Sequence, residues 1–218
     1  MEIIRAEVRV KTRNEVCMTP VTEFPIAEVI RRIEELNSQL AKFWSQSDGW
    51  APVGAAALLG KSRLDWQVSL SGSLRRWIRD PAETLTPAEL ILAWVNLGSL
   101  IEGTIKLFLS VYYDTFKVDI ENLNKVSFFN RKKQKALSPD GLTLEPLRQY
   151  CKLREILDND DLALVELVQQ RRNAIHAFKD RPTGDKAEFE EAVRSYLQML
   201  RNVIARLPYP SDEYVPSE

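Results

Sequence analysis

The fold is decided by the stretch TPAELILAWVNLGSLIEGTIKLFLSVY, residues 86–112. Its first residues carry the signals of a helix start: Thr86 can cap the helix, Pro87 suits the first turn, and Glu89 completes a capping box. Apolar side chains then recur at spacings of three and four, as the buried face of a helix requires. These side chains are Leu90, Trp94, Leu97, Ile101, Ile105, Phe108 and Tyr112. The stretch therefore predicts one long helix.

Two glycines, Gly98 and Gly103, lie inside this predicted helix. Each costs roughly 1 kcal/mol against alanine in a helix interior. The usual reason to accept that cost is the close approach of another backbone. We therefore expect a second element to pack against the helix at these positions.

The same periodicity predicts further helices on both sides of this stretch. We expect one from residue 25 to a stop at 47–49, one over 54–79, one over 144–157, one over 161–179 and one from 185 to 207. Asp185 and Glu188 form a capping box at the start of the last of these. Residues 117–142, rich in Asn, Lys and Ser, predict a loop insertion. The five tryptophans recur at helical positions and are expected in the core: Trp44, Trp50, Trp66, Trp77 and Trp94.

The two ends of the chain depart from this helical pattern. Residues 2–11 alternate apolar and charged side chains, which predicts a strand, and residues 16–21 could return as the second strand of a hairpin. The expected organisation is therefore a β segment at 1–22, a helical domain at 23–207 and an extended tail at 208–218. The fold class is mainly α, a helical bundle with a short N-terminal β segment or hairpin.

Composition limits the kinds of chemistry that the chain could perform. The 218 residues include 30 basic and 31 acidic side chains, which nearly cancel, so a wholly basic nucleic-acid-coating protein is not expected. The two cysteines form no CxxC pair, and neither a signal peptide nor an apolar run of about 18 residues is found. We expect a cytoplasmic protein without a metal, a cofactor or a membrane partner. His176 is the single histidine, so imidazole chemistry must occur there or at its copy in an oligomer.

His176 lies near the end of the predicted 161–179 helix. On a helical wheel, Leu164, Val168, Ile175 and Phe178 face the core, and Arg171 projects onto the same line. Arg172 and His176 are four residues apart and share a flank, with Asn173 also within reach. This flank predicts a second surface, such as a subunit contact that contains a polar pocket.

An arginine and a histidine without metal ligands fit the cleavage of an RNA phosphodiester. Arginine grips phosphate in a bidentate manner, and histidine accepts and returns protons near neutral pH. The 2′-hydroxyl can be the nucleophile, which would select RNA over DNA. The pair by itself also fits an ordinary surface role, because the macrodipole favours cations at a helix C-terminus.

The stretch RRNAIHAF, residues 171–178, resembles the signature of the HEPN superfamily of helical nucleotide-binding and ribonuclease domains. That family places an arginine, a few residues and a histidine near the end of one helix of a bundle, often with an asparagine just after the arginine. Residues 100–106, LIEGTIK, resemble the acidic helix that lies beside the motif helix in many members. The resemblance covers roughly residues 54–207.

The resemblance implies a homodimer in which two motif helices face each other across one cleft. It implies a metal-independent endoribonuclease, of the kind that acts as a toxin or in phage defence, with RNA as substrate and an antitoxin or defence-system protein as a further partner. His176 would be the general acid or base, Arg171 or Arg172 would bind the scissile phosphate, and Asn173 would orient the pair or hydrogen-bond the substrate. Four residues separate Arg171 from His176, as the common family spacing requires, whereas Arg172 directly precedes the asparagine. Both arginines therefore stay candidates.

Two other hypotheses for the function of the chain stay open. Some family members are non-catalytic modules that bind RNA, a nucleotide or a protein partner. A purely structural helical protein would instead pair both arginines with carboxylates and bury His176.

Three further residues are candidates for binding the substrate. Lys132 and Lys133, in a basic run after two phenylalanines, could hold an RNA backbone, although a solvated basic loop has the same composition. Glu102 is a candidate carboxylate, although its spacing from Lys106 equally predicts a structural i,i+4 ion pair.

Overall fold

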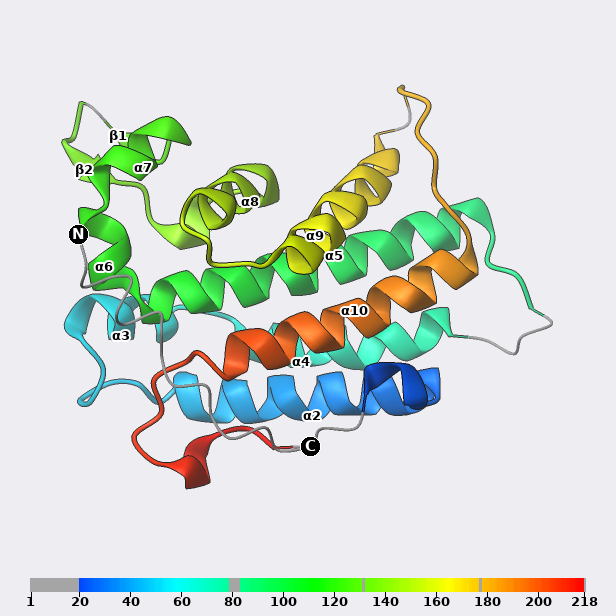
Figure 1. Ribbon diagram of the computed structural model, residues 1–218, viewed down its shortest axis with the longest axis horizontal. Helices are drawn as coiled ribbons and strands as arrows, with labels where there is room; N and C mark the ends of the chain where they lie inside the picture. The colour runs from blue at the N-terminus through cyan, green and yellow to red at the C-terminus, as the bar shows by residue number, and fades with distance from the viewer. Residues whose placement is uncertain (1–19, 79–82, 131, 177, 218) are drawn as a thin grey trace.

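The computed structural model of the chain is mainly helical and describes residues 20–78, 83–130, 132–176 and 178–217 (Figure 1). The strand expected over residues 2–11, and residues 16–19 of its expected partner, lie outside the described residues. Val21, expected to end that partner strand, instead belongs to a 3₁₀ turn, η1 (Val21–Glu23).

The long helix predicted from residues 86–112 is confirmed as α5 (Pro87–Val111). Its capping box is complete: Glu89 N donates to Thr86 Oγ1 at 3.3 Å, and Thr86 N donates to Glu89 Oε2 at 2.9 Å. Most of its side chains are buried, including Trp94 and Leu97 at 0% exposure. In Figure 1, α5 runs through the middle of the molecule, with α8 and α9 on one side and α10, α4 and α2 on the other. This helix is therefore the axis of the core.

The helices around α5 follow the predicted periodicity, with ends that differ by several residues. They are α2 (Ile26–Trp44), α3 (Val53–Leu59), α4 (Leu64–Ser73) with the 3₁₀ turn η2 (Leu74–Trp77), α6 (Tyr113–Val118), α8 (Leu144–Leu153), α9 (Asn159–Arg172) with the 3₁₀ turn η4 (Asn173–Ile175), and α10 (Lys186–Ile204). The single helix expected over 54–79 is wrong, because the chain turns at Gly60 and Ser62. There the Ser62 hydroxyl donates to Leu59 O at 2.5 Å.

The segment 117–142, expected as a loop insertion, contains regular structure. It forms α7 (Ile120–Lys125), a hairpin of β1 (Phe129–Asn130) and antiparallel β2 (Lys135–Ala136), and the 3₁₀ turn η3 (Pro139–Gly141). The physical reason is Phe128, which is 1% exposed and packs with Phe116 and Tyr150 at ring-centroid distances of 6.4 and 6.1 Å. This buried ring anchors a segment whose composition is otherwise that of a loop.

The C-terminal tail is held against α2 and includes the 3₁₀ turn η5 (Asp212–Tyr214). The rings of Tyr209 and Tyr214 pack on Phe43 at 5.2 and 5.4 Å. Ser217 N donates to Gln39 Oε1 at 3.1 Å, and Gln39 Nε2 donates to Ser217 O at 2.7 Å. The tail expected as an extended segment over residues 208–218 is thus packed against α2 in its described part, residues 208–217.

The tryptophans divide between the core and the surface. Trp44 and Trp94 are buried, as expected, and Trp77 is half-buried. Trp50 and Trp66 are 47% and 59% exposed, so their expected place in the core is wrong. Trp50 lies against the tail cluster, 5.0 Å from the Phe43 ring, and Trp66 lies under the Arg63 guanidinium at 4.1 Å.

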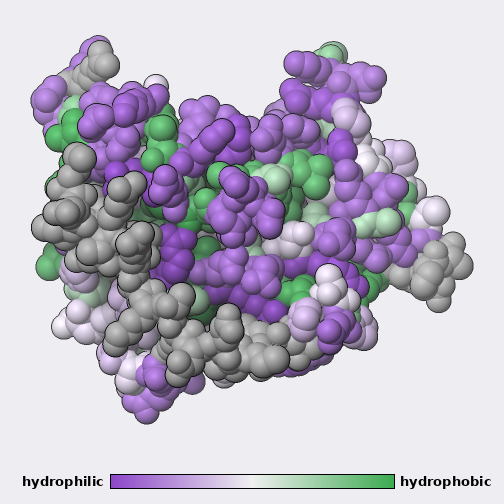
Figure 2. All heavy atoms as spheres, viewed as in Figure 1, coloured by the Kyte–Doolittle hydropathy of each residue, from purple (hydrophilic) through white to green (hydrophobic). Residues whose placement is uncertain are grey.

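Helix α5 is also the one described helix that is long and apolar enough to cross a membrane by length and composition, although the sequence suggested no such run. Within the fold, 61% of its apolar window is buried, as in the core helix of a soluble protein. Hydrophilic side chains dominate the face seen in Figure 2, and hydrophobic ones show between them in separate patches.

Candidate functional site

The motif residues lie where α9 ends. The helix expected over 161–179 stops at Arg172, and the chain continues through η4 to His176, the residue that follows the turn. The wheel therefore fails beyond Arg172: Ile175 is 50% exposed and Phe178 is fully exposed, so neither faces the core. The chain must leave the helix here because the loop returns to α5, where Trp94 Nε1 donates to Thr183 O at 2.7 Å.

Arg171 is bound in a bidentate manner by Glu188 of α10. Its Nε and Nη2 donate to the two carboxylate oxygens at 2.8 Å each, and its Nη1 donates to Pro182 O at 3.0 Å. The Glu188 carboxylate raises the pKa of Arg171 above its ordinary value. Glu188 was expected to complete a capping box with Asp185. Only half of that box forms, in which Glu188 N donates to Asp185 Oδ1 at 2.9 Å, because the carboxylate of Glu188 binds Arg171.

Arg172 is bound by Glu102 of α5. Its Nη1 donates to Glu102 Oε2 at 3.1 Å, and the other oxygen of that carboxylate accepts from Lys106 Nζ at 2.8 Å. The predicted Glu102–Lys106 pair is confirmed, and Glu102 also holds Arg172 in place. The Glu102 carboxylate therefore lies between two cations, Lys106 and Arg172.

The two glycines of α5 were expected to allow the close approach of another backbone. They instead make room for side chains. A Cβ at Gly98 would lie 2.7 Å from Arg172 Cδ and 3.4 Å from Val168 Cγ1, so the stem of Arg172 rests on α5 because residue 98 has no side chain. At Gly103 the neighbour is the amide of Gln67. Gly98 is thus the residue of α5 that allows Arg172 to reach Glu102.

His176 is exposed, and its imidazole has no hydrogen-bond partner among the described residues. Its backbone N donates to Asn173 O at 3.2 Å, which closes the 3₁₀ turn. Residues three apart are eclipsed in a 3₁₀ turn, whereas residues four apart meet in an α-helix. The turn therefore brings His176 into register with Asn173, and not with Arg172 as the wheel suggested.

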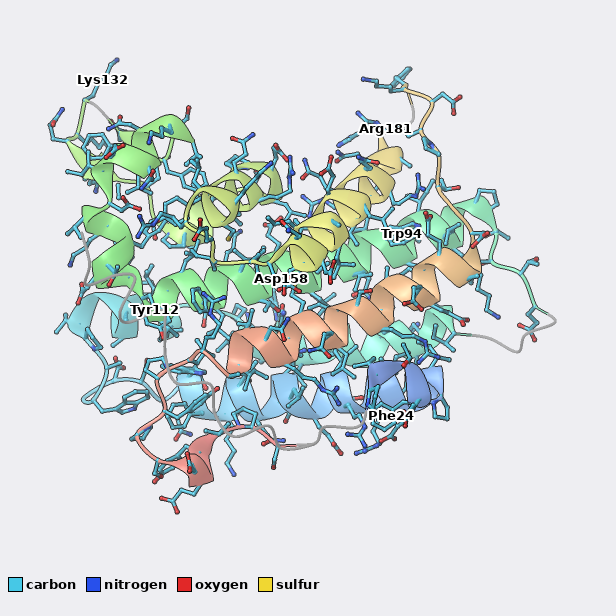
Figure 3. The ribbon with its side chains drawn as sticks, in the orientation of Figure 1. Phe24, Trp94, Tyr112, Lys132, Asp158 and Arg181 are labelled. Atoms are coloured by element: carbon cyan, nitrogen blue, oxygen red, sulfur yellow. The ribbon has the colours of Figure 1, made fainter. Side chains whose placement is uncertain are left out.

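Lys132 and Lys133 are exposed on the turn between β1 and β2. Figure 3 shows Lys132 and Arg181, which lies in the loop after the motif, at opposite ends of the molecule with α8 and α9 between them. A single chain therefore does not bring these lysines to the motif. Lys133 N donates to Asn130 Oδ1 at 3.0 Å, which closes the turn.

The arrangement agrees in part with a structural role of the motif and in part with a functional one. Both arginines are paired with carboxylates, as in a structural protein, but His176 is exposed, as in a functional one. Sequence reasoning missed Glu188 as the partner of Arg171, because its spacing from Asp185 favoured the capping box. The neighbouring proline-containing turn was the available signal, since it brings the start of α10 back to the end of α9.

Neither metal nor thiol chemistry is indicated near the motif. The described residues contain no cluster of three or more His, Cys, Asp or Glu side chains that could hold a metal. Cys151 is buried, and burial raises the pKa of its thiol to about 12. Cys17 lies outside the described residues.

Known proteins were compared with this chain at the levels of family, sequence and structure. No protein-family model, no curated protein and no solved structure matches it.

Proposed function

We propose that this chain is a metal-independent endoribonuclease of HEPN type that acts as a homodimer in the cytoplasm, as a toxin or a phage-defence effector. The observation that carries the proposal is the exposed imidazole of His176, without a partner among the described residues and directly after a helix that ends in two arginines. Proton transfer requires a histidine that substrate can reach, and the exposed imidazole of His176 meets this requirement.

The proposed reaction requires two proton transfers, and this requirement favours a dimer. When the 2′-oxygen attacks phosphorus, its proton must be taken up, and the departing 5′-oxygen must receive one as its bond to phosphorus breaks. One chain supplies a single imidazole, so two copies of His176 could act as base and acid together. The exposed apolar side chains of Ile175 and Phe178 lie on either side of His176 in sequence and would be covered by the second copy.

The arginines would stabilise the charge that develops on phosphorus. Arg172 is the better candidate on contacts, because one nitrogen donates to Glu102, whereas Arg171 uses all three nitrogens on Glu188 and Pro182. Arg172 could turn toward a phosphate at the loss of one hydrogen bond. Asn173, in register with His176, would orient the substrate.

The test is cleavage of a single-stranded RNA in EDTA by the wild type and by His176→Ala. We expect the wild type to give products with 2′,3′-cyclic phosphate and 5′-hydroxyl ends, and His176→Ala to lower the rate by about 100-fold or more. Lys179→Ala, which removes an exposed cation three residues later, is the matched control and should cleave normally. An RNA with 2′-O-methyl groups should resist cleavage. Equal cleavage by the wild type and His176→Ala would sink the proposal.

A second candidate is a non-catalytic helical module that binds RNA, a nucleotide or a protein partner. The observation that favours it is the engagement of both arginines by carboxylates, above all the bidentate pair of Arg171 with Glu188. This candidate predicts RNA binding in a filter assay, loss of binding in Arg172→Ala and no cleavage product at any pH. Lys132→Ala and Lys133→Ala would then report whether the hairpin contributes to the binding.

A further inference from the structure

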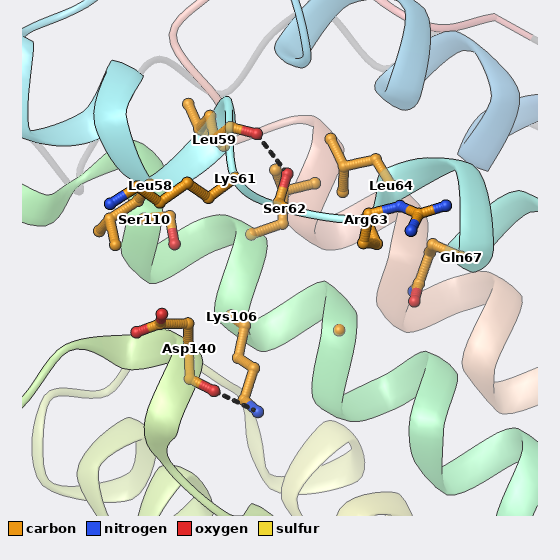
Figure 4. Close-up of a pocket in the computed structure, with 12 residues that line it drawn as sticks. Leu58, Leu59, Lys61, Ser62, Arg63, Leu64, Gln67, Lys106, Ser110 and Asp140 are labelled. Atoms are coloured by element: carbon orange, nitrogen blue, oxygen red, sulfur yellow. Dashed lines mark hydrogen bonds between the residues drawn. The ribbon is translucent and has the colours of Figure 1, made fainter.

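A cavity of about 270 Å³ lies between the turn that joins α3 to α4, helix α5 and the 3₁₀ turn η3 (Figure 4). Residues of the α3–α4 turn line one side, and Lys106 and Asp140 lie on the other. Its volume is slightly below the range of about 300–1,000 Å³ that holds drug-sized ligands. The cavity is separate from the motif loop, although Lys106 at its rim contacts Glu102.

The floor of this cavity is apolar. Leu59, Leu64 and Leu107 are each less than one tenth exposed and line it together with Leu58. Such a floor accommodates the hydrocarbon body of a ligand, because covering it removes apolar surface from water.

One hydroxyl in the wall has no protein partner. Ser110 is 8% exposed and lines the cavity, and its side-chain oxygen makes no hydrogen bond to any described residue. On the same helix, Ser99 and Thr104 donate to the carbonyl four residues earlier, at 2.9 and 3.0 Å. A serine hydroxyl that is not bound to the protein can donate one hydrogen bond and accept others. Ser110 therefore offers a hydrogen bond to a molecule in the cavity.

The rim carries one cation that is not paired with a carboxylate of the described residues. Lys61, Arg63 and Lys106 line the cavity, against the single carboxylate of Asp140. Arg63 is paired with Asp65, and Lys106 with Glu102, whereas exposed Lys61 has no partner among the described residues. The rim therefore favours an anionic group beside Lys61.

We propose that this cavity is a binding site for a small amphipathic organic acid, whose apolar body lies on the three leucines while its carboxylate is held by Lys61 and accepts a hydrogen bond from Ser110. A neutral ligand would leave the Lys61 ammonium without a partner. Binding of the acid at this site would not require the proposed ribonuclease activity.

The test uses 4-phenylbutyrate as the probe and 4-phenylbutanamide as its neutral counterpart, added to the full chain while amide resonances are followed by NMR. We expect 4-phenylbutyrate to shift the amides of Ser62, Gly103 and Leu107 in a saturable manner, with a dissociation constant of about 1 mM or lower. The neutral amide should bind about fivefold more weakly, because it forms no ion pair.

Matched variants separate recognition from folding. Lys61→Gln should weaken 4-phenylbutyrate about fivefold, and Ser110→Ala about threefold, since each removes one interaction with the carboxylate. Lys42→Gln and Ser99→Ala make the same changes away from the cavity and should leave the affinity unchanged. No saturable shift at the three amides, equal affinity for the neutral amide, or equal effects of Lys61→Gln and Lys42→Gln would each overturn the proposal.

Discussion

Single carboxylates explain much of the local order at both ends of α9. At its C-terminal end, Glu188 and Glu102 each bind one motif arginine. At its N-terminal end, Asp158 caps the helix by accepting from Asp161 N at 2.8 Å, and Asp161 itself is 6% exposed. Burial, together with the charge of Asp158, raises the pKa of Asp161 to about 6. Asp161 is therefore a buried acid that the fold tolerates better when it is protonated.

Asp161 should make the protein less stable as the pH rises from about 4 to about 7. Its folded-state pKa of about 6 exceeds the ordinary value of 3.8, so its stabilising contribution is complete below about pH 4 and is lost as the pH rises through 6. The loss is at most about 3 kcal/mol, from about two pKa units. In Asp161→Asn this part of the pH dependence of the free energy of unfolding should vanish, as measured by urea denaturation at several pH values.

Asp160→Asn, which removes an exposed carboxylate in the same turn, controls for the loss of a negative charge. A pH dependence that is identical in the wild type and Asp161→Asn would show that burial of this acid does not affect stability.

At the scale of elements, the sequence predicted the long helices α2, α5, α9 and α10 but misplaced several helix ends and missed the break between α3 and α4. The capping box at Thr86 and the apolar spacing of residues 90–112 are local signals, so α5 could be predicted nearly to the residue. The end of α9 depends on contacts distant in sequence: Trp94 binds Thr183, and Glu188 binds Arg171. Periodicity contains no information about those contacts, which is why Ile175 and Phe178 were wrongly expected in the core.

The same limit applies to the candidate site. The candidate residues of the motif could be selected from their types and spacing. Their partners could not, because Glu102 is 70 residues away from Arg172 and is brought to it by helix packing at Gly98. Ser110 carries no sequence signal at all, since its missing hydrogen bond is visible only in three dimensions.

Gly184, in the loop between α9 and α10, should be the glycine of this region least tolerant of substitution. Its φ of +70° is in the left-handed region, and a Cβ there would lie 3.1 Å from Arg171 Nε and still closer to the Glu188 carboxylate. We expect Gly184→Ala to lower the free energy of unfolding by about 2 kcal/mol, from backbone strain and a displaced ion pair. Urea denaturation provides the measurement.

Gly141→Ala is the matched control, because a Cβ at Gly141 meets nothing within 4 Å, and its effect should stay below about 0.5 kcal/mol. If both variants unfold at the same urea concentration, the loop conformation does not depend on Gly184.

At the scale of the whole molecule, the chain closes on itself through its C-terminal tail. The tail packs its tyrosines on the α2 aromatics and reaches back to Gln39, so that residues 178 positions apart are hydrogen-bonded. Tyr209 also covers Trp44, at a ring-centroid distance of 5.7 Å. The tail is thus part of the hydrophobic core around the C-terminal end of α2.

Deletion of residues 208–218 should therefore destabilise the whole domain. We expect a loss of about 3 kcal/mol, from the removal of two aromatic side chains that pack on the core, and a red shift of the tryptophan emission as Trp44 gains contact with water. Gln39→Ala removes only the polar contacts at the tip and should cost less than about 1 kcal/mol. A deletion variant with the wild-type urea midpoint and emission would show that the tail contributes nothing to the core.

The carboxylate of Glu102 would connect the two proposed binding events thermodynamically. An organic acid held by Lys61 and Ser110 would also attract the Lys106 ammonium at the rim of the cavity, which would leave Glu102 to Arg172 alone and weaken the hold of Arg172 on a phosphate. By linkage, an RNA phosphate bound to Arg172 would strengthen the Glu102–Lys106 pair and lower the affinity of the cavity for the acid by the same factor. The shared carboxylate would thus make the two proposed ligands mutual antagonists without direct contact between them.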